Sequence, residues 1–175
     1  RAEPNLYAAS QPTDTVKLYA QAQRSEDRNP GASDRSSAQL GAAFSAERRR
    51  GGKRASTWGD LGATGSWANK PVNLYGMAIA RGFADYVQEA VFEGAQIWNP
   101  EIREFADDPG SRGGDSDGGQ KMLRAMANDP NALGYAGLLY DHAGLKPIAI
   151  AQDDGGVAVA PTEASVRDHR YPLSR

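Results

Sequence analysis

Cysteine is absent from this 175-residue chain, and histidine occurs only twice. The lack of cysteine excludes disulfide bonds, thiol catalysis and cysteine-based zinc sites, although it does not assign the chain to a compartment. The two histidines, His142 and His169, are too isolated to form a metal site with a carboxylate, and neither has a serine motif beside it. We therefore predict that the chain is not an enzyme and that it holds no metal and no cofactor.

Long apolar runs and a strong net charge are also missing. No apolar run reaches the roughly 18 residues that a membrane-spanning helix needs. The formal net charge of -2 gives no general attraction to nucleic acid or to an anionic membrane. One basic cluster, residues 48–50 with Lys53 and Arg54, could contact phosphates, but a solvated helix end is favoured in an acidic chain. We predict neither a nucleic-acid partner nor a membrane span.

The length suits one domain with one core. Residues 1–15 are polar, interrupted by proline and without apolar periodicity, which predicts an N-terminal tail. Residues 16–175 are predicted to form a single α/β lobe. Because the chain begins Arg1-Ala2-Glu3-Pro4, without methionine or the apolar segment of a signal peptide, we expect a processed or excised product.

Apolar periodicity divides the lobe into alternating strands and helices. Strands are expected at residues 16–22, 72–79, 102–105, 133–140 and 146–151, and helices at 36–50, 83–93, 121–127 and 162–166, the last capped by Thr162. The segment 107–119, rich in Gly, Asp and Ser, is expected to be the most mobile loop. Strands with apolar interiors that alternate with helices indicate an α/β fold whose mostly parallel sheet carries helices on both faces.

The most informative segment is 72–93, where a buried strand passes through a short loop into an amphipathic helix. The free N–H groups at a helix start, together with the positive end of the helix dipole, form an anion site. We therefore predict ligand-binding residues at this junction, namely Ala80, Arg81, Gly82 and Phe83. Arg81 is the charged residue of the loop, although an ordinary surface arginine is the simpler interpretation of it.

Two other patterns look like ligand motifs but lack essential residues. Gly51-Gly52-Lys53 is not a P-loop, because Glu47 stands where a glycine is required and Arg54 where a hydroxyl should bind Mg²⁺. Residues 115–118 look like the start of a calcium loop, but no glutamate follows at the position of the bidentate ligand, so a polar turn is favoured. The adjacent carboxylates at 107–108 and 153–154 are expected to be solvated loop residues.

Several short motifs, taken together, resemble one protein family. They are Phe44-Ser45, Thr57-Trp58-Gly59-Asp60-Leu61-Gly62, Trp67-Ala68, Pro71-Val72-Asn73-Leu74-Tyr75-Gly76, Asn128-Asp129-Pro130-Asn131-Ala132-Leu133-Gly134-Tyr135-Ala136-Gly137, Ala160-Pro161-Thr162-Glu163 and Arg170-Tyr171-Pro172-Leu173-Ser174-Arg175. Their order and spacing resemble the phosphate-binding receptors of bacterial ABC transporters over residues 16–175. The resemblance implies a periplasmic-binding-protein fold of two α/β lobes joined by crossover strands, of which this chain corresponds to the second.

The resemblance also implies where that lobe contacts its ligand. In this family the second lobe donates an arginine, followed by a Ser-Gly-Thr triplet that opens a helix. These positions fall here on Met77 and on residues 81–83, and Gly82 alone matches the family. The implied protein is a periplasmic or otherwise extracytoplasmic solute-binding protein with an altered ligand site. Its partners would be a small oxyanion such as phosphate and an ABC transporter permease or another protein. The alternative is a structural or protein-interaction module that keeps the lobe and binds no small molecule.

Overall fold

The computed structural model describes residues 16–21, 34–36, 55–61, 63–79, 82–92, 94, 96, 98–110, 114–152 and 156–174, and gives only the backbone of 16–21, 34–36, 82 and 83. The strands are β1 (Val16–Gln21), β2 (Asp34–Ser36), β3 (Asn73–Met77), β4 (Arg103–Phe105), β5 (Ala132–Gly137), β6 (Leu145–Pro147) and β7 (Ala149–Ala151). The helices are α2 (Gly82–Phe92), α3 (Gly118–Ala127) and α4 (Glu163–Arg167), with short 3₁₀ turns η5 (Gly65–Trp67) and η6 (Gly114–Ser116).

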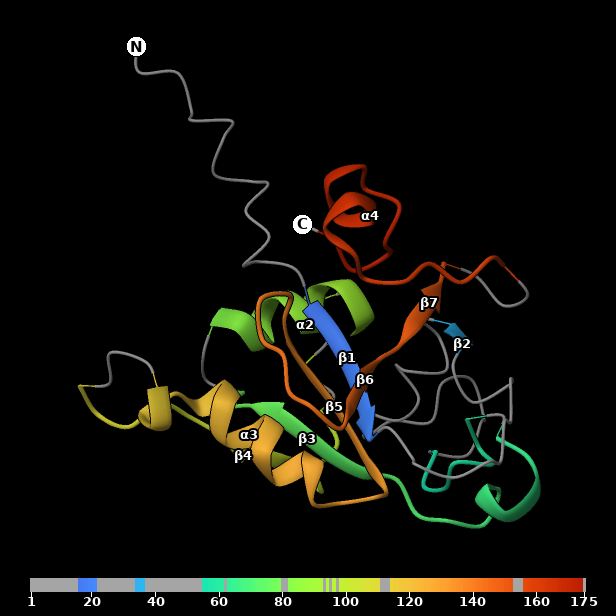
Figure 1. The fold of residues 1–175 in the computed structure, drawn as a ribbon, viewed down its shortest axis with the longest axis horizontal. Coiled ribbons are helices and arrows are strands. Elements are labelled where there is room, and N and C mark those ends of the chain that lie inside the picture. The colour runs from blue at the N-terminus through green and yellow to red at the C-terminus, as the bar shows by residue number, and fades with distance from the viewer. Residues whose placement is uncertain are drawn as a thin grey trace.

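The main sheet contains five strands in the order β4-β3-β5-β1-β6, and β2 pairs with β7 in a separate sheet (Figure 1). β3 is parallel to β4 and β5, whereas β1 is antiparallel to both of its neighbours, β5 and β6. Four strands of this sheet therefore share one direction, which confirms the predicted mostly parallel α/β arrangement. β1 is the exception, and nothing in its local sequence indicates its direction.

Two predicted elements need correction or lie outside the described residues. Segment 146–151, predicted as one strand, forms the ends of two strands, β6 in the main sheet and β7 in the small one. Pro147 is the last residue of β6 and has no N–H to continue the hydrogen-bond ladder. Ser36, the first residue of the predicted helix 36–50, ends strand β2 instead. The rest of that helix, the basic cluster and the tail 1–15 lie outside the described residues.

Successive residues of the central strands face two separate apolar layers. The first, here called the α2 layer, includes Leu74, Leu133 and Tyr135 of the strands with Val87 and Phe92 of α2. The second, the α3 layer, includes Tyr75, Ala132 and Ala136 with the fully buried Met122, Leu123 and Met126 of α3. Because neighbouring side chains along a strand point to opposite faces, α2 and α3 cover opposite faces of the sheet (Figure 1), as predicted.

The tryptophans all lie on the α2 side. Trp58 is buried and meets Trp67 edge-on, with 5.8 Å between the ring centroids. Trp98 packs edge-on against Phe92, with 4.9 Å between the ring centroids, and tilted against Tyr135, with 5.9 Å between the centroids. The glycine-rich connection that carries the first two tryptophans thus closes one side of the α2 layer.

α3 starts earlier than its apolar periodicity indicates. It was expected to begin at Lys121 but begins at Gly118, because Asp117 caps it by accepting the backbone N–H of Gln120 at 3.0 Å. Asp107 accepts the N–H of Gly118 at 2.8 Å. Segment 107–119 was predicted to be a loop throughout, but residues 118–119 belong to α3, and Asp107 and Asp117 hold the start of that helix.

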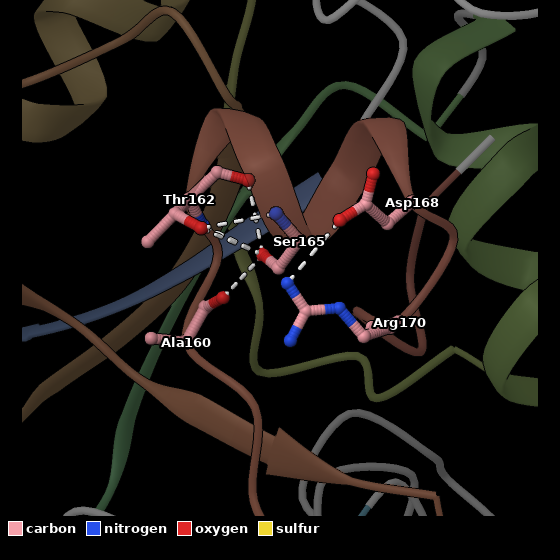
Figure 2. A network of polar contacts seen from close by, with 5 residues as sticks. All are labelled: Ala160, Thr162, Ser165, Asp168 and Arg170. Atoms are coloured by element: carbon pink, nitrogen blue, oxygen red, sulfur yellow. Dashed lines mark hydrogen bonds and ion pairs between the residues drawn. The ribbon is translucent and has the colours of Figure 1, made fainter.

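α4 has the N-terminal cap that its sequence predicts (Figure 2). The Thr162 hydroxyl accepts the N–H of Ser165 at 3.1 Å, and the Ser165 hydroxyl accepts the N–H of Thr162 at 2.9 Å. Ser165 also donates its hydroxyl hydrogen to the Ala160 carbonyl, at 2.6 Å. These reciprocal bonds form a capping box and tie the helix to the chain before it. In the described part of the chain, no helix is long and apolar enough to cross a membrane.

Candidate functional site

The predicted junction between a strand and a helix is present in the backbone. β3 ends at Met77 and α2 begins at Gly82, and the Ala78 N–H donates to the Phe105 carbonyl at 2.8 Å. This turn leaves the sheet at the carboxyl end of β3, beside the parallel strand β4. In open α/β sheets, ligands bind outside the carboxyl ends of parallel strands. Gly82 thus opens the helix where an anion site was predicted, while Ala80, Arg81 and the side chain of Phe83 lie outside the described residues.

Glu104 of β4 contacts this junction, although no local sequence pattern indicates it. Its carboxylate accepts the backbone N–H of Ile79 at 2.9 Å. Glu104 pairs in register with Gly76, so the parallel alignment of two strands far apart in the sequence brings it to the loop that follows β3. The junction therefore carries a negative charge next to the donors that an anion would need.

Tyr135 of β5, in the α2 layer, contacts the same turn. Its hydroxyl donates to the Met77 carbonyl at 3.2 Å, and its ring lies where a side chain on Gly76 would be. A Cβ at that glycine would come within 2.8 Å of the ring, so the strand needs glycine for this close approach. Burial, and then the charge of Glu104, raise the pKa of Tyr135, which keeps the phenol protonated and able to donate.

The start of α3, the other helix N-terminus near this edge, already has acceptors for its N–H groups. Asp107 and Asp117 accept the N–H groups of Gly118 and Gln120, and Tyr140 donates its hydroxyl to Asp117 at 2.9 Å. Burial, then the hydrogen bond to Asp117 and the nearby carboxylates, raise the pKa of Tyr140 to about 12. Lys121 also forms an ion pair with Asp108 at 2.9 Å, so the charged side chains at the start of α3 already have partners within the protein.

The carboxylates of the segments that look like ligand motifs have structural partners. Asp115 pairs with Arg124 at 2.7 Å, and Asp117 is the cap of α3, so these two carboxylates serve the helix. Asp108 is exposed, as predicted, and Asp107 is exposed but also holds the helix start. The pair at 153–154 lies outside the described residues. Among the residues that the structure describes, no three His, Asp or Glu side chains gather as a metal site would require.

Two of the motifs that carry the family resemblance contact each other at the amino ends of β3 and β5, opposite the junction. Asp129 accepts hydrogen bonds from the Asn73 amide at 2.8 Å, from the Tyr75 hydroxyl at 2.9 Å and from the Asn131 N–H at 2.9 Å. Arg103 donates to the Tyr75 hydroxyl at 2.7 Å and lies 4.0 Å from the Asp129 carboxylate.

These contacts change how Asp129 titrates. Burial alone would raise the pKa of Asp129, but the bonds from Asn131, Asn73 and Tyr75, together with the charge of Arg103, lower it below its ordinary value. The motif that contains Asp129 is therefore explained by the pairing of β3 with β5, and it does not form part of the junction.

The strand order, the two covering helices and the turn at the carboxyl edge define this chain as an α/β lobe of the periplasmic-binding-protein type. Solved structures share the fold. One, described as a possible phosphate-binding protein from Planctomyces limnophilus, matches 92% of this chain and 50% of its own with a TM-score of 0.70 and 22% identity. An ABC-type phosphate transport receptor from Vibrio cholerae matches 92% of this chain and 55% of its own with a TM-score of 0.61 and 11% identity.

The sequence identifies the family. Over 139 residues, or 78% of this chain, it is 36% identical to the phosphate-binding protein PstS of Pseudomonas aeruginosa, in two strains. The chain belongs to the phosphate ABC transporter substrate-binding protein family. It spans 39% of the length of these curated relatives and about half of the solved structures, which fits one lobe of a longer receptor. No protein-family model matches the chain.

Proposed function

We propose that this lobe contributes to an oxyanion site in an extracytoplasmic solute-binding protein of a transport system, and that its phosphate contacts are altered. The observation that carries the proposal is the turn from β3 into α2, which begins at Gly82, in a chain 36% identical to a phosphate-binding protein. Helix N–H groups at such a turn can bind an anion. The relatives are named as binding proteins and transport receptors, which supports a role in transport and not in catalysis.

The proposed alteration rests on the side chains at the positions of the family motif. Met77 stands where the resemblance places an arginine, and Arg81 and Phe83 stand where it places serine and threonine. A guanidinium and two hydroxyls would replace part of the hydration shell of phosphate, and this lobe lacks them at those positions. We expect weak phosphate binding by the chain, because one lobe also cannot enclose an anion. The remaining contacts of the site would come from a first lobe, and the protein partner would be an ABC transporter permease or another protein.

Calorimetric titration of the 175-residue chain with phosphate and with sulfate tests this proposal. We expect dissociation constants well above the micromolar range. A micromolar or tighter constant for phosphate would show that other donors have replaced the family contacts. If no anion binds at all, the lobe is better explained as a structural or protein-interaction module.

Arg81→Ala tests the predicted site directly. A charge-assisted hydrogen bond contributes roughly 1.5–3 kcal/mol, so any residual anion affinity should fall on the order of tenfold to a hundredfold. The free energy of unfolding should change by less than about 0.5 kcal/mol, as for a surface substitution. Arg167→Ala, which removes an exposed arginine of α4, is the matched control and should leave anion binding unchanged. Unchanged binding in Arg81→Ala would make Arg81 an ordinary surface residue.

A further inference from the structure

We propose that Glu104 is a specificity-determining residue that weakens the binding of free anions at the β3–α2 junction. Its carboxylate already holds the Ile79 N–H at 2.9 Å, so the protein supplies its own anion to a donor of the turn. This inference rests on the proposed function, because it concerns which ligands the same junction accepts.

The position of Glu104 follows from the pairing of β4 with β3. Both neighbours of Glu104 contact Tyr75 on the α3 side of the sheet. Arg103 donates a hydrogen bond of 2.7 Å to the Tyr75 hydroxyl, and the Phe105 ring stacks on the Tyr75 ring with 6.1 Å between the centroids. Because side chains alternate along a strand, Glu104 lies on the α2 side, the side on which the helix begins. Its register partner is Gly76, and the Tyr135 ring fills the space beside that glycine.

The hydrogen bond of the Glu104 carboxylate goes to the backbone of the turn. In the described part of the chain, Arg103 bonds to Tyr75, Lys121 pairs with Asp108 and Arg124 pairs with Asp115. None of the ion pairs formed there involves Glu104. Its charge is felt as far as the Tyr135 hydroxyl, whose pKa it helps to raise after the larger effect of burial.

Two effects then act against an incoming oxyanion. The Ile79 N–H is occupied, and a donor that already has a charged acceptor must be released before it can bind another. The carboxylate also repels a second negative charge, although Glu104 is exposed and solvent weakens this repulsion. Both effects lower the affinity of this turn for phosphate and sulfate.

Two variants separate charge from donor competition. Glu104→Gln removes the charge but keeps an oxygen that can accept from Ile79, and Glu104→Ala removes both. We expect the affinity for inorganic phosphate to rise about two- to fivefold in Glu104→Gln and about tenfold in Glu104→Ala. Glu89→Gln, which removes the same charge from an exposed position on α2, should leave the affinity unchanged.

Nuclear magnetic resonance of the amide groups of the full chain reads both steps. Hydrogen exchange at the Ile79 amide should accelerate in Glu104→Ala. When phosphate is titrated to tens of millimolar, the chemical shifts of the amides of residues 79–83 should report a higher phosphate affinity in that variant than in wild type. If wild type and both variants bind phosphate equally at these amides, the proposed function stands and Glu104 does not weaken anion binding. If phosphate shifts none of these amides in any variant, while the Ile79 amide is freed, the proposed function itself is wrong, and this inference falls with it.

Discussion

Asp129 shows how one carboxylate fixes the relative position of two strands. It accepts hydrogen bonds from side chains of β3 and from the backbone just before β5, and it does so with 15% of its side chain exposed. A carboxylate with several donors is stabilised in its charged form. The same donors would be left without an acceptor if the charge or the oxygen were removed, so we expect Asp129 to matter for stability more than other acidic residues do.

Asp129→Asn should lower the free energy of unfolding by about 1–3 kcal/mol at neutral pH, because an amide nitrogen then faces donors that need an acceptor. The pKa of Asp129 is lowered in the folded state, so its contribution is present above the ordinary aspartate pKa of about 3.9 and is lost as pH falls through the lower folded value. Urea unfolding at pH 7 and near pH 3 should therefore show a smaller difference between variant and wild type in acid.

Asp115→Asn is the matched control for this substitution. It removes the same charge from a side chain that is 95% exposed and pairs directly with Arg124 at the surface. Exposed pairs contribute less than about 1 kcal/mol, so this variant should remain near wild type at both pH values. If the two variants lose equal stability, the bonds that Asp129 accepts from β3 contribute nothing beyond an ordinary surface charge.

At the scale of single elements, α4 is a helix of five residues whose formation depends on its cap. So short a helix is unstable by itself, and packing and capping must hold it. Thr162→Ala should lower the free energy of unfolding by about 0.5–2 kcal/mol, since the Ser165 N–H loses its acceptor. Glu163→Gln, which removes only an exposed ion pair with Arg167, should cost less than about 0.5 kcal/mol. Thermal melts of both variants would settle the ranking, and an equal loss in both would contradict the capping role.

The elements that local patterns specify were predicted well from sequence, and the contacts between distant strands were not. Apolar periodicity and Thr162 were sufficient to predict α2 and α4, and a short apolar run was sufficient to predict β3. The early start of α3 depends on Asp107, which reaches it across a loop. The direction of β1 depends on its partners β5 and β6. Glu104 has no local signal, because only the register of two parallel strands brings it to Ile79. The ligand-binding roles of residues 80–83 stay predictions.

At the scale of the whole molecule, one sheet separates two apolar layers, and its strands couple them. Leu74 and Tyr75 are neighbours in β3 but belong to different layers, and so do Leu133 and Ala132 of β5. A strand that loses its packing on one face cannot keep its register on the other, because the same backbone carries both sets of side chains. We therefore expect both layers to unfold together, as small domains usually do.

Met126→Ala tests this coupling, because the substitution and the spectroscopic probe lie on opposite faces. Met126 is fully buried in the α3 layer, while Trp58, Trp67 and Trp98 all lie on the α2 side. The cavity should lower the free energy of unfolding by about 2–5 kcal/mol, whereas Met126→Leu should cost less than about 1.5 kcal/mol. In urea, tryptophan fluorescence and far-ultraviolet circular dichroism should give one shared midpoint for wild type and a shared, lower midpoint for Met126→Ala. If the fluorescence midpoint stays at the wild-type value while the circular dichroism signal is lost earlier, the two layers unfold independently and the sheet does not couple them.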